Sequence, residues 1–454
     1  MRSGIPCPGW AVLAPIASGM MMKDRKRPRI TVAPLRPIGR RVTHFLPGQI
    51  LRTAVLFGLF CIAFLMAAVS NPGHAKAASN DDAFRSFVAA LWPDAQRMGV
   101  SRATFDAALA GVKPDPSLLH VSGKQAEFVK PIWQYLSASV SSARVARGRA
   151  RGAEFEQTLA KVEARYGVDR YVILAVWGME TNYGAYSGKS SIIRSLATLA
   201  QAGYRGTFFR DELLVALKIL DEGHIDSAGM LGSWAGAMGQ TQFMPSSFMK
   251  YAVDWDGDGH KNIWTSVPDA LASTAYYLAE HGWIKGWTWG YEVVLPPNFS
   301  LTAFEPQDFR PFSQWASAGL TRTDGESMPR VGEGALLLPA GRNGPALLVT
   351  RNFQAIKSYN TSTAYALGVA LLSDQLAGAS GLRTPWPVNE RTLDAKQSLE
   401  MQKHLVRFGY RIGDLDGKIG EKAQTAIRHY QRQAGLEPDG FPNLPLLERM
   451  RKRP

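Results

Sequence analysis

The sequence of 454 residues has only two cysteines, Cys7 and Cys61, and both precede residue 78. A mature chain that begins near residue 78 has no cysteine and can form no disulfide bond. Histidine is also scarce, and residues such as His224 and His281 show no metal-ligand spacing. We therefore interpret these histidines as structural.

Acidic side chains are nearly absent from residues 1–77, which hold 11 Lys or Arg and one acid, Asp24. This segment carries most of the net charge of +14. An uncharged apolar run at 53–70 is followed by an Ala-x-Ala pattern at 75–77, which is typical of a signal peptide. We predict an exported protein whose leader is cleaved, although the apolar run is also long enough to be retained as a membrane anchor. The remaining chain has little net charge and no basic-aromatic stripe, which argues against nucleic-acid binding.

The spacing of apolar residues predicts a fold that is mainly α (α+β). Helical periodicity covers most of 80–222 and returns at 359–378, whereas short apolar runs between Pro and Gly at 290–350 predict a few strands. The predicted parts are a basic leader at 1–77, a helical domain with a small β-containing insertion at 80–379, a proline-containing linker at 380–392 and a separate small domain at 393–454.

One glutamate, Glu180, ends an otherwise apolar predicted helix in the stretch VWGMETNYG. Asp169 is a plausible N-cap for this helix, and helical spacing places Val176 and Trp177 on the same face as Glu180. Burial and the negative end of the helix dipole both favour the protonated form of a carboxyl group, which is what a general acid needs. A surface glutamate near a turn would explain the same pattern without any function.

The segment GSWAGAMGQTQFMPSSF at 232–248 is rich in glycine and includes Ser233, Gln240 and Gln242. Glycines allow backbone groups to approach a ligand closely. The same composition also suits tight packing against a helix, so the pattern alone leaves both readings open.

Together with YAVDWDGDGHKNIW at 251–264, these motifs resemble the B-type (membrane-bound) lytic murein transglycosylases. These are lysozyme-like enzymes of the Gram-negative cell envelope. The resemblance covers roughly 82–378, and the three motifs follow the order found in the family. It implies a lysozyme-like catalytic domain, a periplasmic location and peptidoglycan glycan strands as the substrate.

The resemblance also implies that Glu180 is a single catalytic acid/base and that no cofactor is required for the chemistry. It further implies these substrate-binding residues: Ser233, Gln242, Tyr277, Tyr359, Asn360 and Tyr365. In this family the 6-hydroxyl of the muramoyl sugar attacks its own anomeric carbon and leaves a 1,6-anhydromuramoyl end. Two alternatives stay open: a hydrolytic muramidase, which needs a second carboxylate or a held water, and an inactive peptidoglycan-binding scaffold.

A loop that begins DWDGDGHKN resembles the start of an EF-hand and predicts a structural Ca²⁺ site. Asp254, Asp256 and Asp258 occupy the first ligand positions, and His260 offers its carbonyl. Position 12 is a threonine, and the family resemblance points to Asp269 as the closing carboxylate. A turn held by Asx hydrogen bonds is the alternative.

The last 60 residues resemble the small helical peptidoglycan-binding domain of many cell-wall enzymes, which indicates a three-helix unit. The residues expected in its core are Leu405, Ala426, Ile427, Tyr430 and Leu446. The resemblance implies that this domain increases the local concentration of substrate. We expect a monomer that works on peptidoglycan, with other cell-wall enzymes as partners.

Overall fold

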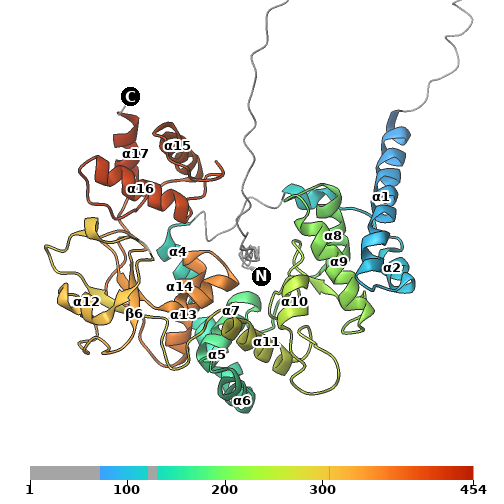
Figure 1. The fold of residues 1–454 in the computed structure, drawn as a ribbon, viewed down its shortest axis with the longest axis horizontal. Helices are drawn as coiled ribbons and strands as arrows, with labels where there is room; N and C mark the ends of the chain where they lie inside the picture. The colour runs from blue at the N-terminus through green and yellow to red at the C-terminus, as the bar shows by residue number, and fades with distance from the viewer. Residues whose placement is uncertain (1–71, 121–129, 306, 453–454) are drawn as a thin grey trace, which may run out of the picture. The chain divides into compact units, whose positions relative to one another are not determined.

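The computed structural model describes residues 72–120, 130–305 and 307–452 (Figure 1). The helices that precede the sheet are α1 (Pro72–Arg97), α2 (Arg102–Leu109), the 3-10 helix η1 (Pro116–His120), α4 (Ile132–Ser139), α5 (Ser142–Glu154), α6 (Glu156–Tyr166), α7 (Arg170–Thr181), α8 (Ile192–Gln201), α9 (Phe208–Asp221), α10 (Pro245–Tyr251) and α11 (Val267–Glu280). Two more, α13 (Arg351–Tyr359) and α14 (Thr363–Leu376), follow the sheet. Residues 1–71 of the predicted leader lie outside the described residues. Within the described part of the chain, no helix is long and apolar enough to cross a membrane.

Helix α7 belongs to the core of the helical domain. It begins at Asp169, whose carboxylate accepts hydrogen bonds from the backbone N–H groups of Tyr171 and Val172, as predicted for an N-cap. It ends at Asn182, which adopts a left-handed conformation with φ 51°. Residues 172–181 are all buried. A helix that is apolar on every side is a core helix, and α7 is therefore a rigid support for the residues at its ends.

Helix α14 packs against α7 and runs antiparallel to it. Tyr365, near the start of α14, is hydrogen-bonded to Glu180 near the end of α7. At the opposite ends of the two helices, Asp374 lies within electrostatic reach of Asp169. The pair therefore has two ends with different polar residues, one at Glu180 and one at Asp374.

The predicted β-containing insertion is present as a five-stranded antiparallel sheet. Its strands are β3 (Gly290–Val294), β4 (Arg310–Pro311), β5 (Thr321–Arg322), β6 (Glu333–Leu337) and β7 (Ala346–Val349), in the order β4-β6-β7-β3-β5. It carries the 3-10 helix η2 (Leu301–Ala303) and helix α12 (Phe312–Ser317). A separate apolar cluster around Trp315 and Leu348 forms its core. Two short strands elsewhere, β1 (Ser190–Ser191) and β2 (Leu231–Gly232), pair with each other.

The C-terminal residues form a separate three-helix bundle, as predicted (Figure 1). Its helices are α15 (Ala395–Arg407), α16 (Glu421–Gln433) and α17 (Leu444–Arg451). Asp394 and Gln397 form a reciprocal capping box at the start of α15. The five residues expected in the core are all buried.

Polar contacts attach this bundle to the sheet. Arg428 of α16 is only 6% exposed, and its guanidinium donates to the backbone oxygens of Leu301 and Phe304. Arg432 pairs with Glu305 at 2.5 Å. The segment 380–392 is also anchored, because the backbone N–H groups of Arg383 and Thr384 donate to the carboxylate of Glu292. The bundle is therefore docked on the sheet, although the sequence predicted only a linker between the two.

Arg428→Ala should weaken this docking because it leaves two carbonyl oxygens without their buried donor. We expect a loss of about 1–3 kcal/mol in the free energy of unfolding, with faster proteolysis within 380–392. Urea unfolding and limited trypsin digestion measure the two effects. Arg411→Ala, at an exposed position of the same domain, is the control. Identical unfolding midpoints and digestion rates for both variants would contradict a docked bundle.

Candidate active site

Glu180 lies in the last turn of α7 and is only 1% exposed. The hydroxyl group of Tyr365, from the first turn of α14, donates to Glu180 Oε1 at 2.5 Å. Burial raises the pKa of the Tyr365 phenol well above its usual value, and the negative charge of Glu180 raises it further. Tyr365 thus remains a neutral donor, and the packing of two helices fixes the carboxylate.

Two more of the predicted site residues, Tyr277 of α11 and Tyr359 of α13, pack against each other with ring centroids 4.8 Å apart. The Tyr277 hydroxyl donates to the backbone oxygen of Ser358, and the Tyr359 hydroxyl donates to that of Thr241. Burial is the main cause of the raised pKa of both phenols, and the charge of Glu180 contributes to both. Glu180 is therefore surrounded by phenols that stay protonated.

The glycine-rich segment is tied to α7 through Gln240, which the sequence did not single out as a site residue. Its side-chain oxygen accepts from the indole N–H of Trp177 at 2.9 Å, and its backbone oxygen accepts from the Thr181 hydroxyl at 3.2 Å. These two bonds hold the segment against the turn that carries Glu180. The position of Gln240 in the motif was the available signal, since a buried indole N–H needs an acceptor.

Ser233, Gln242 and Asn360 are all buried and organise their own surroundings. The Ser233 hydroxyl oxygen accepts from the backbone N–H of Ala237 at 3.0 Å. The Gln242 amide donates to the backbone oxygens of Ser187 and Gly239, and its backbone has a positive φ of 51°. Asn360 accepts from the N–H of Ser362 at the start of α14. These contacts shape the backbone around the site, and whether the same side chains bind a substrate stays a prediction.

Glycine is required where the segment that follows Glu180 meets the glycine-rich segment. Gly188 has φ 91°, and a Cβ atom on it would lie 2.1 Å from the backbone oxygen of Gly232. Any other side chain would push the segment after Glu180 away from the glycine-rich segment.

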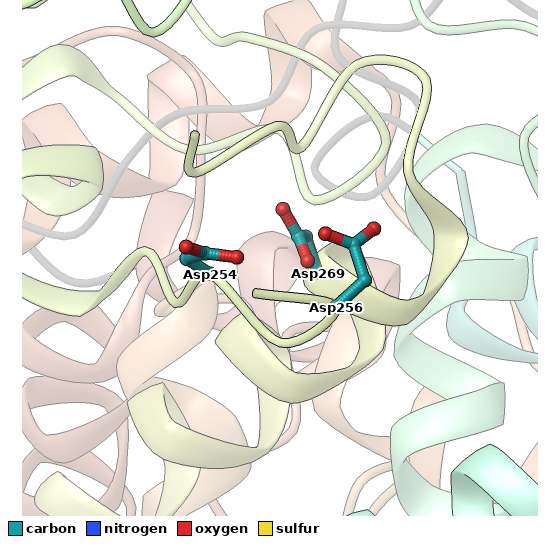
Figure 2. A group of neighbouring side chains, drawn as sticks. All are labelled: Asp254, Asp256 and Asp269. Atoms are coloured by element: carbon teal, nitrogen blue, oxygen red, sulfur yellow. The ribbon is translucent and has the colours of Figure 1, made fainter. Parts of the chain in front are cut away.

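Three of the five predicted calcium ligands come together in a separate cluster. Oxygen atoms of Asp254, Asp256 and Asp269 all lie within 4.8 Å of one another (Figure 2). Asp269, the carboxylate suggested by the family resemblance, is fully buried, and burial raises its pKa. Asp258 lies outside this group, and its carboxylate accepts from the backbone N–H of His260. The backbone carbonyl of His260 stays a predicted ligand.

These carboxylates also hold the loop itself, as the alternative of an Asx turn predicted. Asp254 accepts from the N–H groups of Gly257 and Gly259, and Asp269 accepts from those of Trp255 and Asn262. Three converging carboxylates fit a hard cation that prefers oxygen ligands, because each oxygen has a further lone pair.

The described helical domain has the lysozyme-like fold that the resemblance implies. The chain belongs to the transglycosylase SLT family, because residues 83–374 match that family's "Transglycosylase SLT domain". Residues 395–450 match a "putative peptidoglycan binding domain". The family, the fold class and the C-terminal domain predicted from the sequence are thus confirmed.

Two relatives illustrate the similarity. The membrane-bound lytic murein transglycosylase B of Escherichia coli K12 is 37% identical over 229 residues, or 49% of this chain and 61% of that protein. The chain thus spans about three fifths of the length of this curated relative. SltB3 of Pseudomonas aeruginosa, solved in complex with NAG-anhNAM-pentapeptide, is 44% identical with a TM-score of 0.77, and the match covers 81% of this chain and 99% of that one.

A third relative is Escherichia coli Slt35, solved in complex with calcium. It is 30% identical with a TM-score of 0.56, over 65% of this chain and 92% of that chain.

Proposed function

We propose that this protein is a lytic murein transglycosylase that cleaves the bond between N-acetylmuramic acid and N-acetylglucosamine in peptidoglycan. The observation that carries the proposal is the buried carboxyl group of Glu180, hydrogen-bonded to a neutral phenol in a domain of this family. The complex of SltB3 with NAG-anhNAM-pentapeptide supports an anhydro sugar as the product.

Glu180 would act first as an acid and then as a base. It protonates the glycosidic oxygen, and the N-acetylglucosamine end leaves with that proton. The acetamido oxygen of the muramoyl sugar stabilises the positive charge that develops at the anomeric carbon. Glu180, now ionised, takes the proton from the 6-hydroxyl of the same sugar, whose oxygen attacks the anomeric carbon. The product is a 1,6-anhydromuramoyl end, and no water is consumed.

The distribution of buried acids supports a mechanism with a single carboxylate. Among the described residues, the buried acids are Glu180, Glu212 and Asp269. Glu212 accepts from the backbone N–H and the hydroxyl of Ser246, and thereby holds the start of α10. Asp269 holds the loop of the aspartate cluster. A hydrolase would need a second carboxylate or a held water beside the substrate, and these two buried carboxylates are engaged in local structure.

The tyrosines would position Glu180 and its substrate. Tyr365 holds one oxygen of the Glu180 carboxyl group, and the other oxygen would face the reacting sugar. Ser233, Gln242, Tyr277, Tyr359 and Asn360 would contact the glycan on the surrounding segments. The docked C-terminal domain would bind neighbouring peptidoglycan, and the leader would export the protein to the periplasm.

We further propose that Asp254, Asp256 and Asp269 bind a structural Ca²⁺ ion. The charge of Asp256 adds to the burial that raises the pKa of Asp269, so a cation between them would relieve this repulsion. The ion would stiffen the loop that leads into α11, which carries Tyr277, and would take no part in the chemistry.

Glu180→Gln should lower kcat by about 10²–10⁴-fold, because the amide cannot transfer the proton, while the fold and wall binding persist. Mass spectrometry of digested sacculi gives the product directly. Parent-protein fragments lighter than hydrolysed muropeptides by the mass of one water would confirm the anhydro product. Reducing muramic ends would show instead that water attacks, and sacculus binding without fragments from either protein would support an inactive scaffold.

Tyr365→Phe should lower kcat by roughly 10- to 100-fold and change KM less, since it removes one hydrogen bond to a charged group. The paired control is Tyr171→Phe, at an exposed position in the first turn of α7. Steady-state turnover of soluble glycan strands separates the two constants. A normal kcat in the Tyr365 variant would show that the bond to Glu180 has no role in turnover.

Calcium at roughly 10–100 times its Kd should stabilise the folded protein by about 1.5–3 kcal/mol, and chelation should reverse this. Asp256→Asn should abolish the shift in Tm. Asp258→Asn should retain it, because Asp258 lies outside the cluster. Thermal unfolding with calcium and with a chelator measures both. If the parent protein has the same Tm with calcium and with the chelator, the metal site is refuted.

A further inference from the structure

A cavity of about 570 Å³ lies at the end of the α7–α14 pair that is remote from Glu180. Its lining includes Asp169, at the start of α7, and Asp374, near the end of α14. A helix rises 1.5 Å per residue, so Asp169 and Glu180 are separated by about 16 Å along α7. The proposed mechanism uses nothing in this cavity, and it is a separate site.

One wall of the cavity is aromatic. The loop after α11 supplies three indoles, those of Trp283, Trp287 and Trp289. The fully buried Asn352 fixes this loop, because its amide donates to the backbone oxygens of Ile284 and Trp287 and its oxygen accepts from the N–H of Ile284. The backbone that carries the indoles is therefore held in place before any ligand arrives.

The facing wall carries two carboxylates without a cationic partner. Neither Asp169 nor Asp374 forms an ion pair with a described residue, and the described residues give the Asp374 carboxyl one hydrogen bond, from the Trp289 indole at 3.0 Å. Burial raises the pKa of Asp374 to about 6, and the charge of Asp169 also raises it. The charge of Asp169 thus disfavours the ionised form of Asp374, and a bound cation would offset this repulsion.

The two basic residues at the cavity form no ion pair with these carboxylates among the described residues, although the charge of Arg170 partly offsets the rise in the pKa of Asp169. Arg170 is paired with Glu163 at 2.5 Å. The aliphatic part of Lys285 packs over Gly167, and its ammonium group lies within ion-pair distance of no acid in the part of the chain that the structure describes. The negative charge of the cavity is therefore available to a ligand.

We propose that this cavity binds a primary ammonium group carried on an aliphatic chain, with Asp374 and Asp169 facing the charge and the indoles facing the chain. Indole faces attract cations and also cover apolar stems, so both parts of such a ligand are matched. A neutral sugar would use the indoles but would leave the repulsion between the carboxylates in place. The ammonium group could come from a peptide or from a free diamine.

The test is NMR detection of the indole N–H signals in the full chain, purified in a non-ionic detergent. Cadaverine is the cationic probe, and 1,5-pentanediol is its neutral counterpart of the same length. The signals of Trp283, Trp287 and Trp289, assigned with Trp→Phe variants, should shift saturably with cadaverine. They should stay in place with the diol. No saturable shift with cadaverine, or equal shifts with both compounds, would overturn the proposal.

Asp374→Asn should weaken cadaverine binding by roughly tenfold or more, since it removes a partly buried charge and keeps the shape of the side chain. Asp211→Asn, an exposed carboxylate of α9, is the matched control and should bind like the parent. The Tm of the Asp374 variant at pH 7.5 should be no lower than that of the parent. Burial disfavours the charged form of the Asp374 carboxyl group, and the amide of the variant carries no charge. Unchanged affinity in the Asp374 variant would place the cation elsewhere.

A second pair of ligands separates the two sources of the ammonium group. Acetyl-Ala-Lys-Ala amide presents the same ammonium group on a peptide, and its Nε-acetylated form removes the charge. Binding of the charged peptide, without binding of its acetylated form, would assign the cavity to peptide-borne amines. Binding of cadaverine without the charged peptide would assign it to free diamines.

Discussion

The hydrogen bond from Tyr365 to Glu180 joins the two central helices. Among the described residues, Glu180 is the one buried acid that has no local structural role. A carboxylate at this depth needs a donor, and the donor must come from an element that cannot move away. Helix α14 meets this condition because it packs along the whole of α7. The caps of both helices, Asp169 and Ser362, fix where each begins and therefore where the two side chains meet.

The rest of the helical domain maintains this arrangement. Gln240 links the glycine-rich segment to Trp177, one turn before Glu180. Tyr359 links the same segment to α13 through the backbone oxygen of Thr241. The aspartate cluster acts at a greater distance, since it shapes the loop that leads into α11. Each contact reaches Glu180 through a buried element, so the site is supported by the core and not by surface loops.

Local signals in the sequence predicted much of this fold. The cap at Asp169, the period-3.6 patterns and the core of the C-terminal bundle depend on neighbouring residues, and the structure confirms them. The strand order β4-β6-β7-β3-β5 depends on contacts between distant segments, and the sequence gave no indication of it. Helical spacing placed Val176, Trp177 and Glu180 on one face of α7, but this face is not distinguished by burial, because residues 172–181 are all buried.

Long-range polar contacts were the least predictable feature. Arg428 looks like a solvated residue on an amphipathic helix, yet it is buried against two backbone oxygens of another domain. Asp374 likewise looks like an exposed helix residue, and its environment depends on a tryptophan 85 positions away. Neither environment has a signature within a short stretch of sequence.

The docking through Arg428 has a mechanical consequence. If the C-terminal bundle cannot rotate independently and both domains bind the polymer as proposed, the two binding points have a constant separation. The protein would then respond to the spacing of sites along the polymer as well as to their composition. A stretched strand and a slack strand of the same chemistry would be different ligands for it. Tension in the polymer would then govern which strands can occupy both points at once.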